Sequence, residues 1–321
     1  MFTGCKSPGN SNVSFYYWKT VFELSDHERE TLEHNHVTNL YVRYFDVVIR
    51  QGKSVPVSAV TFKDSVRNIN IVPVIYIKNE VMLQPLVNID SLALDIVTYI
   101  NKINTTASIR NSEIQLDCDW TISSKETFFK FVEKIKAISG KTLSATIRLH
   151  QIKYLDRTGI PPVDKGVLMY YNMGHIAADA SNSIYEREAS KNYLVNLESY
   201  PLPLDVALPV FSWGIHIRNN KVIGLVNKTD DAVFLNDNHF KRVEAPFFEV
   251  NDDVMKAGRY FQQGDRIKIE SISQEDLEDM ADDISAKMAH KPIEIIFYDF
   301  DDFNLNHYPD ENLFQKISTA F

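Results

Sequence analysis

The stretch EIQLDCDW, residues 113–120, decides the fold of this chain. Successive side chains of a β-strand point to opposite faces, so Gln115, Asp117 and Asp119 share one face. Cys118 lies on the other face among apolar neighbours, which predicts a buried, inert thiol. A buried parallel strand is normally apolar throughout. Three polar side chains in a row are unfavourable to bury without partners, so we expect this strand to end at a polar site. The alternative is that the aspartates cap a helix or pair with an arginine.

Short apolar strands alternate with amphipathic helices on both sides of this stretch. A helix that links two strands returns the chain to the same edge, which implies parallel pairing. The expected strands span residues 12–22, 39–48, 70–77, 113–120, 142–150, 166–171, 205–213 and 293–299, and the expected helices span 26–35, 89–104, 123–139, 183–196 and 273–288. A strand count near eight favours a closed (β/α)8 TIM barrel over an open sheet.

A long region after the seventh expected strand breaks this alternation. Residues 214–272 are typical of a β-rich insertion, with a hairpin at 216–227 that turns at Asn219-Asn220 and a further strand at 266–270. The loops that follow barrel strands carry function. We therefore expect this insertion to lie at the mouth of the barrel.

Composition excludes several classes of function. The chain has 321 residues, of which 44% are hydrophobic and 24% charged, as in ordinary globular proteins that bury a large core. A net charge of -9 without a basic cluster argues against a nucleic-acid partner. His27, His34 and His36 lack ligand spacing, and no phosphate loop or dinucleotide motif is present. We expect neither a metal nor a cofactor. No stretch reaches the roughly 20 apolar residues of a membrane span.

The N-terminal residues predict a membrane anchor. The sequence FTGC at residues 2–5 resembles the end of a bacterial lipoprotein signal, in which the cysteine takes a lipid. Residues 6–12 are polar and unsuited to packing. We expect residues 1–12 to be a tether, residues 13–321 to be the barrel, and Cys5 to hold the protein at the bacterial cell envelope, in the periplasm or at the outer membrane. The alternative is a frayed terminus with a chance cysteine.

Polar residues gather at the expected carboxyl ends of other strands, which form the active face of a barrel. Strand five ends in Arg148 and His150. The arginine can neutralise the aspartates or bind substrate oxygens, and the histidine can carry a proton. Strand six ends in Tyr171 and Asn172, which can hydrogen-bond a substrate oxygen. A core tyrosine and a structural histidine are the alternatives.

Aromatic and acidic side chains at further strand ends complete the candidate site. Trp213, at the end of strand seven, is suited to stack on a sugar ring. Its alternative is a place in the core. Asp299 ends strand eight and is the expected catalytic partner from across the barrel. Trp18 and Arg43, from the first two strands, are further candidate binding residues.

The strand that carries Asp117 and Asp119 resembles the fourth strand of family-18 glycoside hydrolases, the chitinase-like barrels. There the pattern is Asp-x-x-Asp-x-Asp-x-Glu, commonly with Trp before the Glu. The two aspartates match the second and third acids, and Trp120 matches the tryptophan. Ile114 replaces the first aspartate, and Thr121 stands where the family has its catalytic glutamate. The resemblance therefore implies the fold, while the family's proton donor is missing.

Three functions remain open. The wider chain is similar to bacterial lipoproteins with glycosidase-like barrels. The first function is a glycoside hydrolase that binds a carbohydrate, with Asp117, Asp119 and Asp299 as its carboxyl groups. Gln115 would join the other strand-end residues in binding the substrate. Such carboxyl groups flank the scissile bond roughly 5–10 Å apart. The second is a non-catalytic glycan-binding lipoprotein on a degenerate barrel. The third is a structural envelope protein that meets a partner through residues 214–272.

Overall fold

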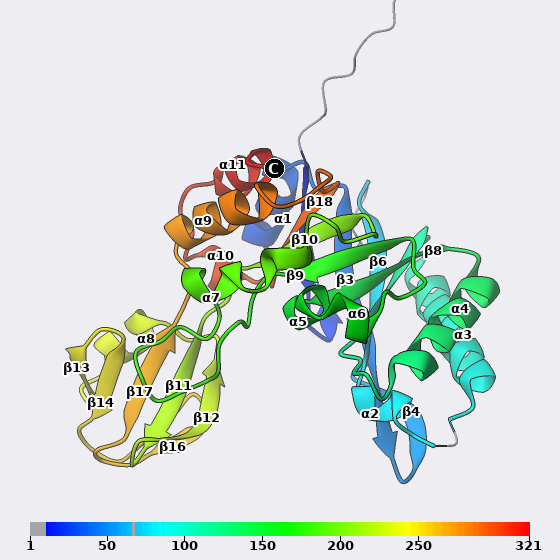
Figure 1. The fold of residues 1–321 in the computed structure, drawn as a ribbon. Coiled ribbons are helices and arrows are strands. Elements are labelled where there is room, and N and C mark those ends of the chain that lie inside the picture. The colour runs from blue at the N-terminus through cyan, green and yellow to red at the C-terminus, as the bar shows by residue number, and fades with distance from the viewer. Residues whose placement is uncertain (1–10, 66–67, 86) are drawn as a thin grey trace, which may run out of the picture.

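The computed structural model describes residues 11–65, 68–85 and 87–321. Eight parallel strands form one closed sheet, because each pairs with the next along the chain and β1 pairs with both β3 and β18. These strands are β1 (Asn12–Tyr17), β3 (Asn39–Arg50), β6 (Asn70–Ile77), β7 (Glu113–Cys118), β8 (Thr142–Arg148), β9 (Lys165–Met169), β10 (Leu204–Pro209) and β18 (Glu294–Tyr298). The predicted (β/α)8 barrel is confirmed (Figure 1).

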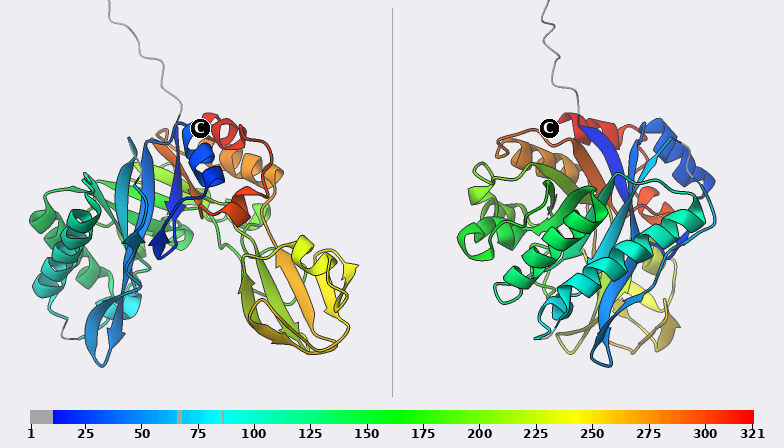
Figure 2. Two further views of the ribbon diagram at one scale, coloured as in Figure 1. Left: turned by 180° about the vertical axis from the view of Figure 1, so that it is seen from behind. Right: turned by 90° about the vertical axis from the view of Figure 1, so that its right-hand side faces the viewer.

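Helices cover the outside of the barrel, and α3 and α4 pack side by side (Figure 2). The α-helices are α1 (Asp26–His34), α2 (Asn79–Met82), α3 (Ile89–Ala107), α4 (Lys125–Ser139), α5 (Leu149–Lys153), α6 (Leu155–Thr158), α7 (Arg187–Lys191), α8 (Asp231–Leu235), α9 (Gln274–Ser285), α10 (Asp302–Leu305) and α11 (Leu313–Thr319). The helix expected at 183–196 is wrong, since only the short α7 and the 3-10 helix η1 (Leu194–Asn196) form there. Within the described residues, no helix has the length and apolar character needed to cross a bilayer.

Six barrel strands end earlier than the sequence predicts. The observed ends are Tyr17 in β1, Cys118 in β7, Arg148 in β8, Met169 in β9, Pro209 in β10 and Tyr298 in β18, rather than residues 22, 120, 150, 171, 213 and 299. After β8 the chain turns directly into α5, because the side chain of Gln151 accepts a hydrogen bond of 2.7 Å from the backbone nitrogen of Arg148. Residues expected at the tips of strands therefore lie in loops or helices.

The region predicted as an insertion forms a second β-sheet between β10 and β18. We call residues 213–270 the β-rich lobe. Its antiparallel sheet has the order β12-β11-β17-β14-β13. The strands of the lobe are β11 (Trp213–Arg218), β12 (Lys221–Asn227), β13 (Phe240–Glu244), β14 (Phe247–Val250), β15 (Val254–Lys256), β16 (Arg259–Phe261) and β17 (Arg266–Glu270). The β11–β12 turn places Asn219 and Asn220 at φ 50° and 58°, as a type I′ hairpin turn requires.

The lobe and the β3–β4 hairpin project from the same side of the barrel (Figure 1). β4 (Lys53–Val57) pairs antiparallel with the end of β3, and the short strands β2 (Val21–Phe22) and β5 (Thr61–Phe62) pair nearby. The lobe has an apolar cluster of its own, which includes Phe234, Phe248 and Ile267. It is therefore a separately packed layer beside the barrel mouth.

Buried and partly buried polar side chains lie inside the barrel at the N-terminal ends of its strands. We call Ser14, Glu113, Lys165, Asp205 and Glu294 the basal cluster. The ammonium nitrogen of Lys165 lies 2.8 Å from Asp205 and 3.1 Å from Glu113. The hydroxyl of Ser14 donates to Glu294 over 2.8 Å. Each charged side chain in this cluster has a polar partner.

Candidate functional site

A cavity of about 720 Å³ opens at the carboxyl ends of the barrel strands. We call it the mouth cavity. Its walls come from the barrel, from β3 and from the lobe, so it lies between the two projections of Figure 1. It is lined by Tyr16, Trp18, Lys19, Thr20, Arg43, Asp46, Tyr76, Asp117, Arg148, Met169, Tyr171, Asn172, Phe211, Ser212, Trp213, Asn227, Lys228, Tyr298 and Asp299.

Five aromatic rings run in an unbroken row along this cavity, from the barrel to the lobe. We call Trp18, Tyr298, Tyr171, Phe211 and Trp213 the aromatic row. Successive ring centroids along it are 5.4, 5.6, 5.9 and 5.2 Å apart. Tyr298 and Tyr171 stack at an interplanar angle of 19°. The row gives the cavity an extended apolar surface, which suits the flat apolar faces of sugar rings.

Asp117 is the acid at the end of β7. It is 5% exposed, and Nη2 of Arg148 lies 3.3 Å from its Oδ1. Burial raises the pKa of the Asp117 carboxyl, although the charge of Arg148 acts in the opposite direction. The guanidinium thus favours the charged carboxylate without fully offsetting its desolvation.

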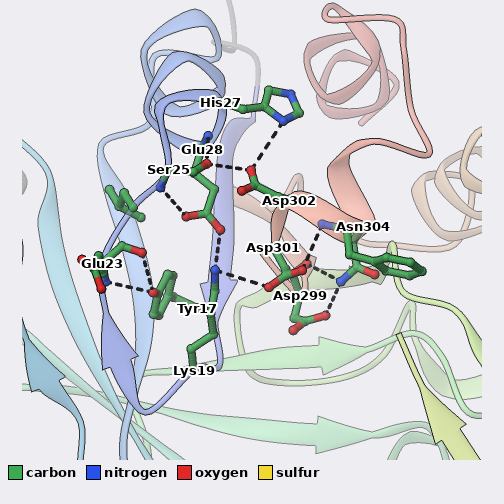
Figure 3. A network of polar contacts seen from close by, with 12 residues as sticks. Tyr17, Lys19, Glu23, Ser25, His27, Glu28, Asp299, Asp301, Asp302 and Asn304 are labelled. Carbon is green, nitrogen blue, oxygen red and sulfur yellow. Dashed lines mark hydrogen bonds and ion pairs between the residues drawn. The ribbon is translucent and has the colours of Figure 1, made fainter. Parts of the chain in front are cut away.

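Asp299 is the acid on the opposite side of the barrel, directly after β18. Burial raises its pKa, while the charge of Lys228 opposes the rise. The side-chain nitrogen of Asn304 donates to Oδ1 of Asp299 over 2.5 Å (Figure 3). Lys228 directs its ammonium group to Asp301 at 2.7 Å, so Asp299 has no cation of its own in hydrogen-bond contact among the described residues.

Two lysines, one from the barrel and one from the lobe, form ion pairs with Asp301, which follows Asp299 by two residues. Lys19 lies 2.6 Å from the buried Glu28 and 3.3 Å from Asp301. Figure 3 marks both contacts with dashed lines. Lys228 reaches the same Asp301 oxygen from the end of β12. Burial raises the pKa of Asp301, but the hydrogen bond and charge of Lys228 outweigh it and bring this pKa below its usual range. The two lysines thus favour the charged form of Asp301, whereas burial disfavours the charged form of Asp299.

Arg43 and Trp18 form the wall on the β3 side. Nε of Arg43 donates to Asp46 over 2.7 Å, across an irregularity in the pairing of β3 with β6. The guanidinium lies 5.7 Å from the centre of the Trp18 ring. This arrangement fixes the tryptophan at one end of the aromatic row.

No protein-family model matches this chain, and no curated protein matches it. Solved structures do share its architecture. The spore cortex-lytic enzyme SleL of Bacillus cereus is 15% identical with a TM-score of 0.56, over 98% of this chain and 75% of that one. A GH18 chitinase from Cycas revoluta, solved with allosamidin, is 12% identical with a TM-score of 0.58, over 96% and 99%. A chitinase-like agglutinin from Robinia pseudoacacia is 11% identical with a TM-score of 0.56, over 96% and 98%.

The chain shares the (β/α)8 fold of these three structures. At these identities the likeness shows the architecture alone. Eight of the residues predicted for a site line the mouth cavity: Trp18, Arg43, Asp117, Arg148, Tyr171, Asn172, Trp213 and Asp299.

Three other predicted residues lie outside the cavity lining. Gln115 is fully buried, and its amide exchanges hydrogen bonds with the hydroxyl of Tyr16. It supports a lining residue rather than reaching a ligand. Asp119 follows the end of β7, and its side chain is 56% exposed, with Oδ1 3.9 Å from Nε of Arg148. His150 is exposed in α5 rather than on β8. The expected pairing of Arg148 and His150 on one strand face is therefore wrong.

Cys118 is fully buried, and burial raises the pKa of its thiol, as expected for an inert cysteine. Cys5, the predicted lipidation site, lies outside the described residues. Among residues 11–65, 68–85 and 87–321, no group of three or more His, Cys, Asp or Glu side chains is arranged to hold a metal ion.

Sequence reasoning missed several cavity residues. Tyr298 and Phe211 complete the aromatic row, and each stands within two residues of a predicted site residue. Their position beside strand ends was a usable signal. Lys228 and Asn227 come from the end of β12 in the lobe, and no strand-end rule for a barrel would have placed them at its mouth.

Proposed function

We propose that this protein binds a carbohydrate chain in the mouth cavity and hydrolyses one of its glycosidic bonds. The observation that carries the proposal is the aromatic row, which crosses a cavity with a partly or fully buried carboxyl group on each of two opposite strands. Extended aromatic surfaces bind sugar faces, and glycoside hydrolysis uses two carboxyl groups. Two of the similar structures, a chitinase and a chitinase-like agglutinin, support this choice of ligand.

The two acids suit different roles. Asp299 is the better proton donor, because burial raises its pKa and no cation binds it directly among the described residues. It would donate its proton to the glycosidic oxygen as the bond to the anomeric carbon breaks. Asp117 is the better carboxylate, because Arg148 lies 3.3 Å from it. It would accept a proton from the water that attacks the anomeric carbon, and return of that proton to Asp299 through solvent completes the cycle.

A second candidate is glycan binding without turnover. Thr121, which stands where the resemblance expects a glutamate, is exposed in the turn after β7. Asp119, the third acid of that pattern, is exposed at the rim. Neither residue supplies a proton donor inside the cavity. A protein of this kind would use the same aromatic row and release no product.

An oligosaccharide panel tests both candidates. Thermal shift with a broad set of neutral and acidic oligosaccharides identifies a ligand, and reducing-end release from that ligand separates an enzyme from a binder. Trp213→Ala should weaken binding by about tenfold or more. The control Tyr154→Ala removes an aromatic ring that is 47% exposed and outside the cavity, so it should bind as the wild type does. If no sugar stabilises the wild type, the carbohydrate proposal is wrong.

We also propose that a lipid on Cys5 holds the protein at the bacterial cell envelope, with the residues between Cys5 and Ser11 as the tether. The support is the sequence FTGC at residues 2–5 and the polar stretch behind it. Mass spectrometry of the protein purified from bacterial membranes should find a diacylglyceryl adduct on Cys5. Cys5→Ser should release the protein from the membrane fraction, and unmodified Cys5 in membrane-extracted protein would contradict the anchor.

A further inference from the structure

Trp213 lies at the junction of the barrel and the lobe. It is the first residue of β11, four residues after β10 ends, and its ring is the last of the aromatic row. Its indole nitrogen donates a hydrogen bond of 2.8 Å to Oε2 of Glu270, which is the last residue of β17. Trp213 and Glu270 also pair directly across the two strands. The orientation of this ring is therefore set from inside the lobe.

Glu270 is a buried carboxylate whose Oε2 accepts two hydrogen bonds, whereas its Oε1 has an ion-pair contact but no hydrogen bond among the described residues. It is 2% exposed, and Lys268, which is fully buried, lies 2.7 Å from its Oε1. The hydroxyl of Ser183 donates to Oε2 over 2.5 Å. A buried ion pair of this kind contributes little net stability compared with apolar residues of the same size. Its presence here calls for a reason beyond packing.

Lys268 and Glu270 also bind the loop that follows β9. Lys268 donates to the carbonyl of Ser181 over 2.8 Å, and the amide of Asn182 donates to the carbonyl of Ser271 over 2.9 Å. The backbone nitrogen of Asn172 donates to the carbonyl of Ile184 at the other end of this loop, and Asn172 lines the mouth cavity. One carboxylate thus ties together β17, the β9 loop and Trp213.

We infer that Glu270 is a positioning residue for ligand binding: it fixes the ring of Trp213 at the lobe end of the aromatic row, with Lys268 as its counter-ion. This inference rests on the proposed carbohydrate function of the mouth cavity. Glu270 does not line the cavity, so it acts through Trp213 rather than on the ligand. A free indole would sample several rotamers, and each bound sugar would have to order it.

A matched pair of double variants tests the inference without leaving a buried charge unpaired. Lys268→Met/Glu270→Gln removes both charges but keeps an oxygen that accepts from Trp213. Lys268→Met/Glu270→Leu removes both charges and the acceptor. Because both variants replace the ion pair by neutral side chains of similar size, both should fold. They differ in the acceptor for the indole nitrogen.

Labelling with 5-fluorotryptophan gives a readout that needs no ligand, since the chain has three tryptophans. In fluorine NMR the Trp213 resonance, assigned with Trp213→Phe, should match the wild type in the glutamine variant. It should shift or broaden in the leucine variant. The affinity for the best sugar of the panel should be retained in the first and fall by about tenfold in the second, as expected for loss of a hydrogen bond to a positioned group.

The Trp213→Phe background supplies the control for acceptor loss. Phenylalanine has no N–H group, so the leucine and glutamine double variants should then bind the sugar equally well. An unchanged Trp213 resonance in the leucine variant, or a shifted resonance with unchanged affinity, would overturn the inference. If no sugar binds the wild type but the resonance still moves only in the leucine variant, Glu270 holds Trp213 and the proposed carbohydrate function is the part that fails.

Discussion

The two ends of this barrel both bury charged side chains, but they satisfy them differently. At the N-terminal end, Asp205 accepts from Lys165 and also from the backbone nitrogens of Ile293 and Glu294. At the other end, Asp299 faces a cavity of about 720 Å³ and has Asn304 as its side-chain partner. Buried charges that are fully paired define a structural core, whereas acids left short of partners in a cavity are candidates for chemistry.

The largest expected effect belongs to the basal cluster. Lys165→Met would leave Glu113 and Asp205 without their shared cation inside the barrel. We expect the free energy of unfolding to fall by about 3–5 kcal/mol, as in other proteins that lose one partner of a buried ion pair. Chemical denaturation measures it. A loss under about 1 kcal/mol would show that the basal charges are solvated and that the contrast between the two ends is false.

Asp117→Asn should have a smaller cost. The substitution removes the carboxylate 3.3 Å from Arg148, whose side chain is 26% exposed and always charged. Burial also raises the pKa of Asp117, but the variant leaves the Arg148 cation without its partner, and this cost is the larger one. We expect a net loss of about 1–2 kcal/mol in the free energy of unfolding, together with loss of any hydrolysis. The double variant Asp117→Asn/Arg148→Met should recover at least half of the stability, since it removes the unpaired cation. If the double variant recovers no stability, the unpaired Arg148 cation is not the cause of the loss.

Asp299→Asn should raise the free energy of unfolding instead of lowering it. Burial raises the pKa of Asp299 in the folded chain above its unfolded value, so the folded state binds this proton more tightly. The wild type therefore loses stability as pH rises from the unfolded pKa of about 3.9 through the folded pKa. At pH 7 the asparagine variant should be more stable than the wild type, and it should lack hydrolysis.

Thermal melts of this variant and the wild type from pH 3 to pH 8 give the measurement. The difference should vanish below pH ~3.9, where the wild-type carboxyl is protonated in both states. Asp252→Asn, at an exposed position, is the control and should show no such trend. A variant less stable than the wild type at pH 7 would mean that Asp299 is paired as fully as the basal acids.

The smallest effect on stability is expected at Asp119, which lies outside the mouth cavity. The side chain of Asp119 is 56% exposed and lies 3.9 Å from Arg148. Exposed pairs contribute about 0–1 kcal/mol. Asp119→Asn should therefore change stability by under about 0.5 kcal/mol and leave sugar binding within about twofold. Loss of binding in this variant would move the centre of the site from the cavity to the rim.

Much of the barrel could be predicted from the sequence, because strand periodicity and the alternation with helices are local signals. The same rule placed Asp117, Arg148 and Asp299 at the mouth, since the carboxyl ends of parallel strands meet on one face. Asp119 and His150 were misplaced because β7 and β8 end earlier than their apolar patterns, and a residue past the strand end loses the alternation.

The cavity residues that come from the lobe could not be predicted from strand periodicity and strand ends. Lys228 lines the mouth cavity, and Glu270 binds Trp213, which lines it too. Both come from the lobe, and no local sequence pattern predicts where the lobe lies relative to the barrel. The sequence correctly predicts that Trp213 lies at the mouth, but for the wrong element. It was expected to end strand seven, whereas it begins β11 of the lobe. Its place at the mouth depends on a contact between segments 57 residues apart.

A crystal structure of Asp299→Asn with the best oligosaccharide of the panel would show where the sugar binds. Removing the proposed proton donor should leave the sugar uncleaved. We expect a sugar chain that lies along the aromatic row from Trp18 to Trp213, with a glycosidic bond between Asp117 and residue 299. A sugar bound on another face of the barrel or lobe, with the mouth cavity empty, would contradict this expectation.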